Sequence, residues 1–290
     1  MATVRVTEPT PGYVVYEIEH PLFTAKVARH GAHVMEWQPT GAEPVLYCSP
    51  TAVLKEGKAI RGGIPICWPW FNAHPTDPSK PSHGFVRNRF WDYQGSEADD
   101  ECVKLRFTLE DSEETRAIWP HAFLLKAEIL LGRELEVRLT TYNRNAETFE
   151  IGGALHTYLT VGNVERVVIK GLEKSGYIDT VGARRECPAT GEAITIQGEI
   201  DRIYHHDGTT HLVDESLRRT LVISKSGSPS TVVWNPWLEK ARAIADMPDD
   251  DYRHFTAIEA VIEPGKVVTL EPGDSDVLTT RISVKPLASA

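Results

Sequence analysis

Short runs of β-branched and aromatic residues recur along almost the whole chain, and they limit the possible fold more than any other feature. In many runs apolar residues alternate with polar ones, which is the pattern of a strand with one face on a core. The runs occupy residues 13–19, 23–28, 102–110, 123–131, 135–143, 166–171, 220–226, 230–235, 255–262, 266–273 and 277–284. Because helical patterns are scarce between them, the predicted fold class is all-β, a large antiparallel β-sandwich with a few short helices.

The clearest connection is a hairpin over residues 123–143, where Gly132 and Arg133 separate two strand-like runs. The glycine is expected to supply the unusual backbone angles of a tight turn. No repeat, low-complexity tract or Gly/Ser linker in the sequence marks a domain boundary. Residues 1–290 are therefore expected to form a single domain.

Two short segments have a helical pattern. One follows Asn235 and has Pro236 at an early helical position, where a missing backbone N–H is tolerated. The other follows Asp214, in the sequence DESLRRT. Both are short, which agrees with a fold made mainly of strands.

The composition is that of an ordinary globular protein, with 41% hydrophobic and 25% charged residues. The net charge of −10 disfavours nucleic acid as a partner, although a local pair of arginines can still bind one phosphate. No membrane segment is expected, and the N-terminus lacks the basic start and apolar core of a secretory signal, so a cytoplasmic location is predicted. No pattern defines the oligomeric state, and a monomer is compatible with the sequence.

Several kinds of chemistry lack their usual motifs. The four cysteines are far apart without a CxxC pair, so they are expected to be reduced thiols. The sequence contains no GxSxG nucleophile elbow, GxGxxG fingerprint or GxxxxGK[ST] phosphate loop. His205, His206 and His211 form the one histidine cluster, but they lie in a polar segment that is typical of a solvated loop rather than of a metal site.

The segment RGGIPICWPW at residues 61–70 is too broken for a helix and too apolar for an ordinary surface loop. It continues into a long proline-rich loop, and such loops are usually functional or disordered. Arg61, His83 and Arg87 within this region could converge on one anion, with nearby glycines letting the backbone approach a ligand. Each arginine could instead cap strands or pair with a surface carboxylate.

Three more segments carry polar residues in apolar surroundings. His156 interrupts the run GGALHTYLTV, where a lone histidine is more often a satisfied core residue than a catalyst. Asp201 in GEIDRIY is most simply a turn or capping residue. Glu259 in TAIEAVI has no adjacent cation, so burial would raise its pKa toward the range of a general base, unless it lies on the solvent face of its strand.

Four motifs taken together resemble one family. They are RGGIPICWPWF with HPTDPSKPSHGFVR, LHTYL, EIDRIY, and VVWNPWLEKARAIADMPDDDYRHFTAIEA. In this order they look like the hexose-6-phosphate mutarotases (glucose-6-phosphate 1-epimerases) of the aldose 1-epimerase superfamily, and the similarity runs from about Gly31 to the C-terminus. Asn72 departs from the family pattern, which commonly has Gly at that position.

The resemblance implies a galactose mutarotase-like supersandwich that needs no metal and no organic cofactor. It also implies roles for individual residues. His156 would be the general acid and Glu259 the general base. Substrate contacts would come from five further residues, with Arg61 and Arg87 on the phosphate, Ser82 and His83 on the same wall, and Asp201 on ring hydroxyls.

The predicted activity is interconversion of the α and β anomers of a hexose 6-phosphate, an isomerase reaction on a small-molecule sugar phosphate. Ring opening requires a base at the C1 hydroxyl and an acid at the ring oxygen. Two alternatives stay open at this stage. The chain could be a non-catalytic carbohydrate-binding protein, or a mutarotase for unphosphorylated aldoses. Trp68, Trp70, Trp234 and Trp237 could line a sugar site, but core packing is the simpler expectation for each.

Overall fold

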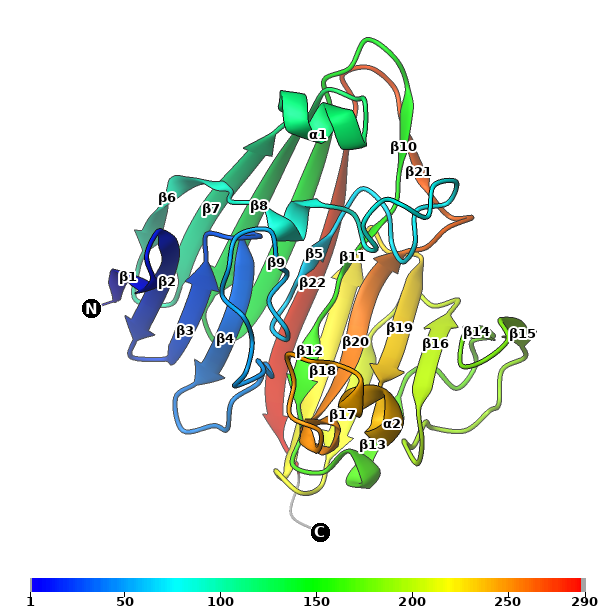
Figure 1. Ribbon diagram of the computed structural model, residues 1–290. Helices are drawn as coiled ribbons and strands as arrows, with labels where there is room; N and C mark the ends of the chain where they lie inside the picture. Colours follow the sequence, from blue (N-terminus) through cyan, green and yellow to red (C-terminus); the bar gives the residue numbers. More distant parts are fainter. Residues whose placement is uncertain (1, 288–290) are drawn as a thin grey trace.

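The computed structural model describes residues 2–287, and it is built almost entirely of antiparallel strands (Figure 1). Two eight-stranded sheets form the body of the molecule. The first, called the β20 sheet, has the order β15-β14-β16-β19-β20-β11-β5, with β12 also paired to β20. Its strands are Ile66–Cys67 (β5), Gly153–Leu155 (β11), Tyr158–Thr160 (β12), Tyr177–Asp179 (β14), Arg185–Cys187 (β15), Ile200–Tyr204 (β16), Ser230–Asn235 (β19) and Phe255–Ile262 (β20).

The second large sheet, called the β9 sheet, has the order β13-β17-β18-β22-β9-β8-β7-β6. Its strands are Asp92–Ala98 (β6), Val103–Glu110 (β7), Phe123–Leu131 (β8), Glu134–Asn143 (β9), Val167–Lys170 (β13), Thr210–Asp214 (β17), Arg219–Ser226 (β18) and Ser275–Pro286 (β22). Figure 1 shows β22 crossing behind the strands of the β20 sheet. The predicted all-β fold with multiple antiparallel sheets is confirmed.

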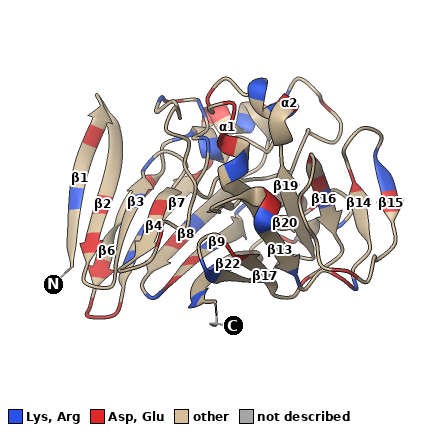
Figure 2. Cartoon of the chain, turned by 90° about the horizontal axis from the view of Figure 1, so that it is seen from below, with Lys and Arg blue, Asp and Glu red and all other residues tan. Residues whose placement is uncertain are grey.

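Two smaller sheets and a few short helices complete the fold. The four-stranded sheet contains Thr3–Thr10 (β1), Tyr13–His20 (β2), Phe23–Ala28 (β3) and His33–Pro39 (β4), and the two-stranded sheet contains Phe149–Ile151 (β10) and Val268–Leu270 (β21). The helices are Glu113–Ile118 (α1) and Trp237–Arg242 (α2), with 3₁₀ turns at Val86–Asn88 (η1), Val164–Arg166 (η2) and Asp251–His254 (η3). Edge strands β1 and β15 carry charges of both signs (Figure 2), which discourages pairing with other chains.

The local predictions agree with the structure at most positions. Each predicted strand segment contains a strand, and β8 pairs with β9 in the expected hairpin. The helix after Asn235 is α2, preceded by Pro236. The predicted helix after Asp214 is wrong, because residues 215–218 form the tight turn between β17 and β18, and Asp214 Oδ1 accepts a hydrogen bond from the Leu217 N–H there. A hairpin needs only a turn to join two paired strands.

The core lies between the two large sheets, and β20 is buried along its whole length. Successive side chains of a strand point to opposite faces. Ile258 and Ile262 belong to the main core, which also contains Val137 and Leu125 of the β9 sheet. Val261 belongs to a separate apolar cluster on the other face of β20. Glu259 shares that second face, so the face of the β20 sheet away from the core is available for a site.

Two further observations concern the described residues. None of the helices within residues 2–287 is long and apolar enough to cross a membrane. All four cysteines, Cys48, Cys67, Cys102 and Cys187, are free, and Cys67 is completely buried.

Candidate active site

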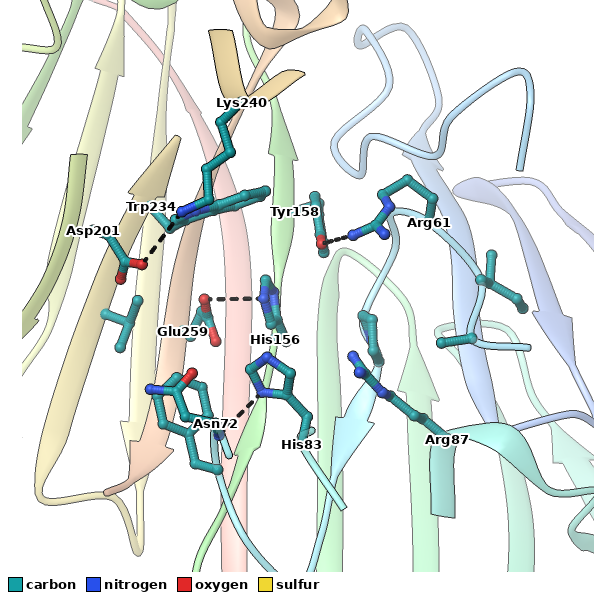
Figure 3. A pocket seen from close by; sticks show the side chains of 15 residues that line it. Arg61, Asn72, His83, Arg87, His156, Tyr158, Asp201, Trp234, Lys240 and Glu259 are labelled. Carbon is teal, nitrogen blue, oxygen red and sulfur yellow. Dashed lines mark hydrogen bonds and ion pairs between the residues drawn. The ribbon is translucent and has the colours of Figure 1, made fainter. Parts of the chain in front are cut away.

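A pocket of about 380 Å³ opens on the outer face of the β20 sheet. It collects residues that are far apart in the sequence, and six of the seven predicted site residues line it or its floor (Figure 3). The lining residues are Ala59, Ile60, Arg61, Pro65, Phe71, Asn72, His83, Arg87, His156, Tyr158, Asp201, Val232, Trp234, Lys240 and Glu259. In Figure 3, Glu259 and His156 lie in the middle, with the two arginines on one side and Asp201 and Lys240 on the other.

Glu259 and His156 form a buried pair at the centre of the pocket. Glu259 stands on β20, and His156 lies between β11 and β12, where its backbone N–H donates to the Pro65 carbonyl at 3.0 Å. Glu259 Oε1 lies 3.3 Å from His156 Nε2. The side chains are 1% and 10% exposed, so the pair is almost completely removed from water.

Burial governs the protonation of both groups. It raises the pKa of Glu259 well above the ordinary value, and the negative charge of Asp201 adds to this effect. Burial also lowers the pKa of His156 well below its ordinary value, helped by neighbouring groups that include Arg87. The uncharged forms of both groups are therefore favoured. A neutral pair and an ion pair contain the same single proton, so a proton shift across the 3.3 Å contact interconverts them without exchange with solvent.

The surroundings of the pair fix the orientation of the imidazole. The ring of Tyr158 stacks on that of His156 with centroids 4.7 Å apart and an angle of 12°, and Trp234 meets His156 edge to face. His156 Nδ1 and Glu259 Oε2 are buried and have no hydrogen-bond partner within residues 2–287. Buried polar atoms are nearly always paired in native structures, so these two atoms are candidates for contact with a bound ligand.

Arg61 is held on one side of the pocket by two residues. Its Nε donates to Asp246 Oδ1 at 3.0 Å, and its Nη1 donates to the Tyr158 hydroxyl at 3.3 Å. Asp246 also lies 3.6 Å from the ammonium of Lys58. Arg61 is thus paired with a carboxylate, which was the alternative expected from the sequence, but its guanidinium also lines the pocket.

Arg87 lies on η1 and differs from Arg61 in having no carboxylate partner within the described residues. Its Nη2 donates to the carbonyl of Ser82 at 3.1 Å, and its buried Nε has no partner there. Ser82 is exposed and is not among the lining residues, so its contact with the site is through the Arg87 guanidinium.

His83 lies beside His156, with the ring centroids 5.8 Å apart, and is uncharged. Burial, followed by the charges of Arg87 and Arg61, lowers its pKa to about 3. Its Nδ1 accepts a hydrogen bond from the backbone N–H of Asn72, which leaves the proton on Nε2. The imidazole can therefore donate a hydrogen bond into the pocket but adds no positive charge. Asn72 has φ of 62°, a conformation that asparagine tolerates better than other residues with a side chain, which explains why it can replace glycine.

Asp201 faces the arginines from the opposite side of the pocket. Burial raises its pKa, while the hydroxyl of Thr180 and the ammonium of Lys240 oppose this shift. Lys240 Nζ lies 4.0 Å from Asp201 Oδ2 and 3.0 Å from Glu199 Oε1. Lys240 and Tyr158 are pocket residues that the sequence did not single out, although both belong to motifs that carry the family resemblance.

The structure corrects two expectations about this region. Gly62 of the RGG segment and Gly84 bring segments of backbone together rather than making room for a ligand. A Cβ on Gly62 would lie 2.4 Å from the Tyr47 carbonyl oxygen, and one on Gly84 would lie 1.8 Å from that of Trp68. Trp68 and Trp70 pack in the core as expected, whereas Trp234 lines the pocket.

Comparisons with known proteins identify the family of this chain. Residues 14–283 match the family model for aldose 1-epimerase. A relative from Escherichia coli (strain K12), named "Putative glucose-6-phosphate 1-epimerase", is 36% identical over 258 residues, which cover 88% of this chain and 86% of the relative. A relative with the same name from Cenchrus ciliaris is 35% identical, with 86% of this chain and 78% of the relative covered.

Solved structures give the same result. A crystal structure of a "putative mutarotase (YeaD)" from Salmonella typhimurium superposes with a TM-score of 0.89 at 33% identity, covering 98% of this chain and 97% of the other. The galactose 1-epimerase of Lactobacillus acidophilus NCFM shares the fold, with a TM-score of 0.76 at 16% identity and 99% of each chain covered. The family model and the relatives cover most of the chain, and the protein therefore belongs to the aldose 1-epimerase family of isomerases.

Proposed function

We propose that the protein interconverts the α and β anomers of a hexose 6-phosphate, with glucose 6-phosphate as the preferred substrate. The observation that carries this proposal is a buried His156–Glu259 pair in one pocket with the guanidinium of Arg87, which has no carboxylate partner within residues 2–287. The pair suits proton transfer at C1 and the ring oxygen, and the guanidinium suits a phosphate. The names of the relatives from Escherichia coli and Cenchrus ciliaris support the phosphorylated substrate.

In the proposed reaction Glu259 accepts the proton of the C1 hydroxyl while His156 donates a proton to the ring oxygen. The C1–O5 bond breaks, and the open aldehyde rotates about the C1–C2 bond. Closure on the other face reverses both transfers, because the O5 hydroxyl returns its proton to His156 and Glu259 returns its proton to the C1 oxygen. The pair starts as carboxylate and imidazolium, which forms from the neutral pair when the single shared proton moves from Glu259 to His156. Hydrogen bonds from sugar hydroxyls to the carboxylate would stabilise that charged form.

The two sides of the pocket would bind the two ends of the substrate. Arg87 and Arg61 would bind the phosphate, with the Ser82 carbonyl holding Arg87 and His83 donating from Nε2. Asp201 would accept hydrogen bonds from ring hydroxyls. Binding energy from the remote phosphate can orient the reacting carbon, which is the reason for a phosphate handle in a reaction that takes place at C1.

Exchange NMR on anomerically pure glucose 6-phosphate, run in parallel with glucose, tests this proposal. The protein is expected to accelerate the approach to anomeric equilibrium for both sugars, with a larger kcat/KM for the phosphate ester. No acceleration with either sugar would favour a non-catalytic sugar-binding protein. Equal kcat/KM for both sugars would favour a mutarotase for unphosphorylated aldoses.

A further inference from the structure

Asp246 is a buried carboxylate that lies just behind the pocket. It is 6% exposed and follows α2 in the segment that also places Lys240 in the pocket. Its backbone carbonyl accepts a hydrogen bond from the Ser49 hydroxyl at 2.8 Å, so its position is fixed from the main chain. The carboxylate contacts Arg61 at 3.0 Å and Lys58 at 3.6 Å.

These contacts determine which part of the Arg61 guanidinium faces the pocket. Asp246 engages Nε, the Tyr158 hydroxyl engages Nη1, and Nη2 has no hydrogen-bond partner within residues 2–287. A free arginine side chain has several rotatable bonds, and ordering it on binding reduces affinity. The contacts with Asp246 and Tyr158 already order the Arg61 side chain, so most of that loss of affinity is avoided.

A carboxylate beside an anion site would normally repel the anion, but the local charges do not sum to a negative value. Arg61 and Lys58 each carry one positive charge against the single negative charge of Asp246, so the three groups retain one positive charge. The carboxylate lies on the Nε side of the guanidinium, while the Nη2 donors are left for a ligand. Asp246 can therefore orient Arg61 without abolishing its attraction for phosphate.

We infer that Asp246 is a positioning residue that aims the Arg61 guanidinium at the phosphoryl group of the substrate. This inference rests on the proposed function. The two arginines are then oriented in different ways. Arg61 is oriented by a buried carboxylate, whereas Arg87 is oriented by a backbone carbonyl and keeps its full charge.

Kinetics of the Asp246→Ala variant with glucose 6-phosphate and glucose test the inference. The KM for glucose 6-phosphate is expected to rise about tenfold, the usual effect of losing one charge-assisted contact, with kcat and the glucose parameters within about twofold of wild type. Glu136→Ala is the matched control, since Glu136 is an 8% exposed carboxylate paired with Arg281 on the β9 sheet. The control should leave the kinetics with both sugars unchanged.

A structural role alone would lower the melting temperature and affect both sugars equally, and that result would overturn the inference. Asp246→Asn is the second variant, because it keeps the shape and an acceptor oxygen and should fold if the alanine variant does not. It is expected to raise the KM for glucose 6-phosphate about threefold. An unchanged ratio of KM values in a folded variant would overturn the positioning role alone, whereas inactivity of the wild type on glucose 6-phosphate would overturn the proposed function.

Discussion

Glu259 on β20 and Glu128 on β8 are both glutamates in the interior of antiparallel strands, yet their surroundings are opposite. Glu128 has a side chain that is 29% exposed and pairs with Lys104 at 2.6 Å, and this contact lowers its pKa. Glu259 is 1% exposed, has no Lys or Arg within ion-pairing distance in the described chain, and has a raised pKa. The same residue type is thus an ordinary surface acid in one sheet and a candidate base in the other.

The difference arises from what covers the outer face of each sheet. On β8, apolar residues face the core and alternate with more exposed ones such as Lys126 and Glu128. On β20 every residue is buried, and Val261 on its outer face shares an apolar cluster with Phe71 of the loop that also carries His83. Covering a sheet on both faces creates a desolvated position for a carboxylate, and the pKa shift follows from that.

The largest expected difference is between the variants that remove the carboxylates of Glu259 and Glu128 one at a time. Glu259→Gln should lower kcat for anomer exchange by about 10² to 10⁴-fold, because a positioned general base is lost. Glu128→Gln, its matched control, should leave kcat within about twofold of wild type. Exchange NMR with glucose 6-phosphate measures both variants. A small effect of Glu259→Gln on kcat would contradict the assignment of Glu259 as the base, and with it the contrast to Glu128.

The pH dependence of kcat/KM is also expected to distinguish Glu259 from Glu128. Between the lowered pKa of His156 and the raised pKa of Glu259 the pair holds one proton, as the reaction requires. Below this window a second proton removes the base, and above it the last proton leaves and removes the acid. We expect kcat/KM to follow a bell-shaped profile from acidic to alkaline pH, with one limb below the ordinary pKa of histidine and the other above the ordinary pKa of a glutamic acid side chain.

Glu128→Gln should keep both limbs of that profile, since Glu128 lies outside the pocket. Glu259→Gln should lose the limb that belongs to the carboxyl group. A flat wild-type profile over this range, with activity present, would contradict the assignment of the pair.

A smaller effect is expected from two arginines, Arg87 on η1 beside the pocket and Arg106 on β7 of the β9 sheet. Arg87→Ala should raise the KM for glucose 6-phosphate by about ten- to a hundredfold, because the guanidinium that we propose as a phosphate contact is lost. The parameters for glucose should change little. Arg106 is the control, since it pairs with Glu97 at 2.8 Å on the β9 sheet, and Arg106→Ala should leave both KM values unchanged. Equal losses of Arg87→Ala on both sugars would contradict a phosphate contact.

The smallest expected difference concerns two glycines with the same backbone angle. Gly62 and Gly95 both have φ of 106°, but only Gly62 has backbone atoms within 4 Å of the position of an added Cβ. Both alanine variants should be destabilised by backbone strain of about 1 kcal/mol, and Gly62→Ala by at least about 1 kcal/mol more because of the clash. Chemical denaturation measures both values. Equal destabilisation would show that the close packing beneath the pocket is not needed for stability.

Much of the site was expected from four motifs that resemble one family, and part of it also from residues that interrupt an apolar pattern. His156 and Glu259 stand out in runs of buried strand residues, and Arg61 and Arg87 flank an irregular loop with many glycines and prolines. The sequence did not decide between the buried and the solvent-facing position of Glu259. The burial of Glu259 depends on the loop that carries Phe71 and His83, which packs against β20 although the two segments are far apart in the sequence.

Other site residues gave no signal of their own. Tyr158 reads as an ordinary aromatic strand residue, Lys240 as the polar face of a short helix, and Asp246 as one acid in an acidic stretch. Each acquires its role from a partner that is distant in the chain, as Asp246 does from Arg61, 185 residues away. The single-domain organisation and the cytoplasmic location remain predictions.

By itself the sequence determined the strands, the main hairpin and the residues able to carry acid–base chemistry. Those features depend on the period of apolar residues and on side-chain type, which are local properties. Only the tertiary structure decided which face of each sheet is covered, which arginine is already paired and which histidine is neutral. These properties depend on desolvation and on charges brought together from distant segments, and the order of residues along one strand does not contain them.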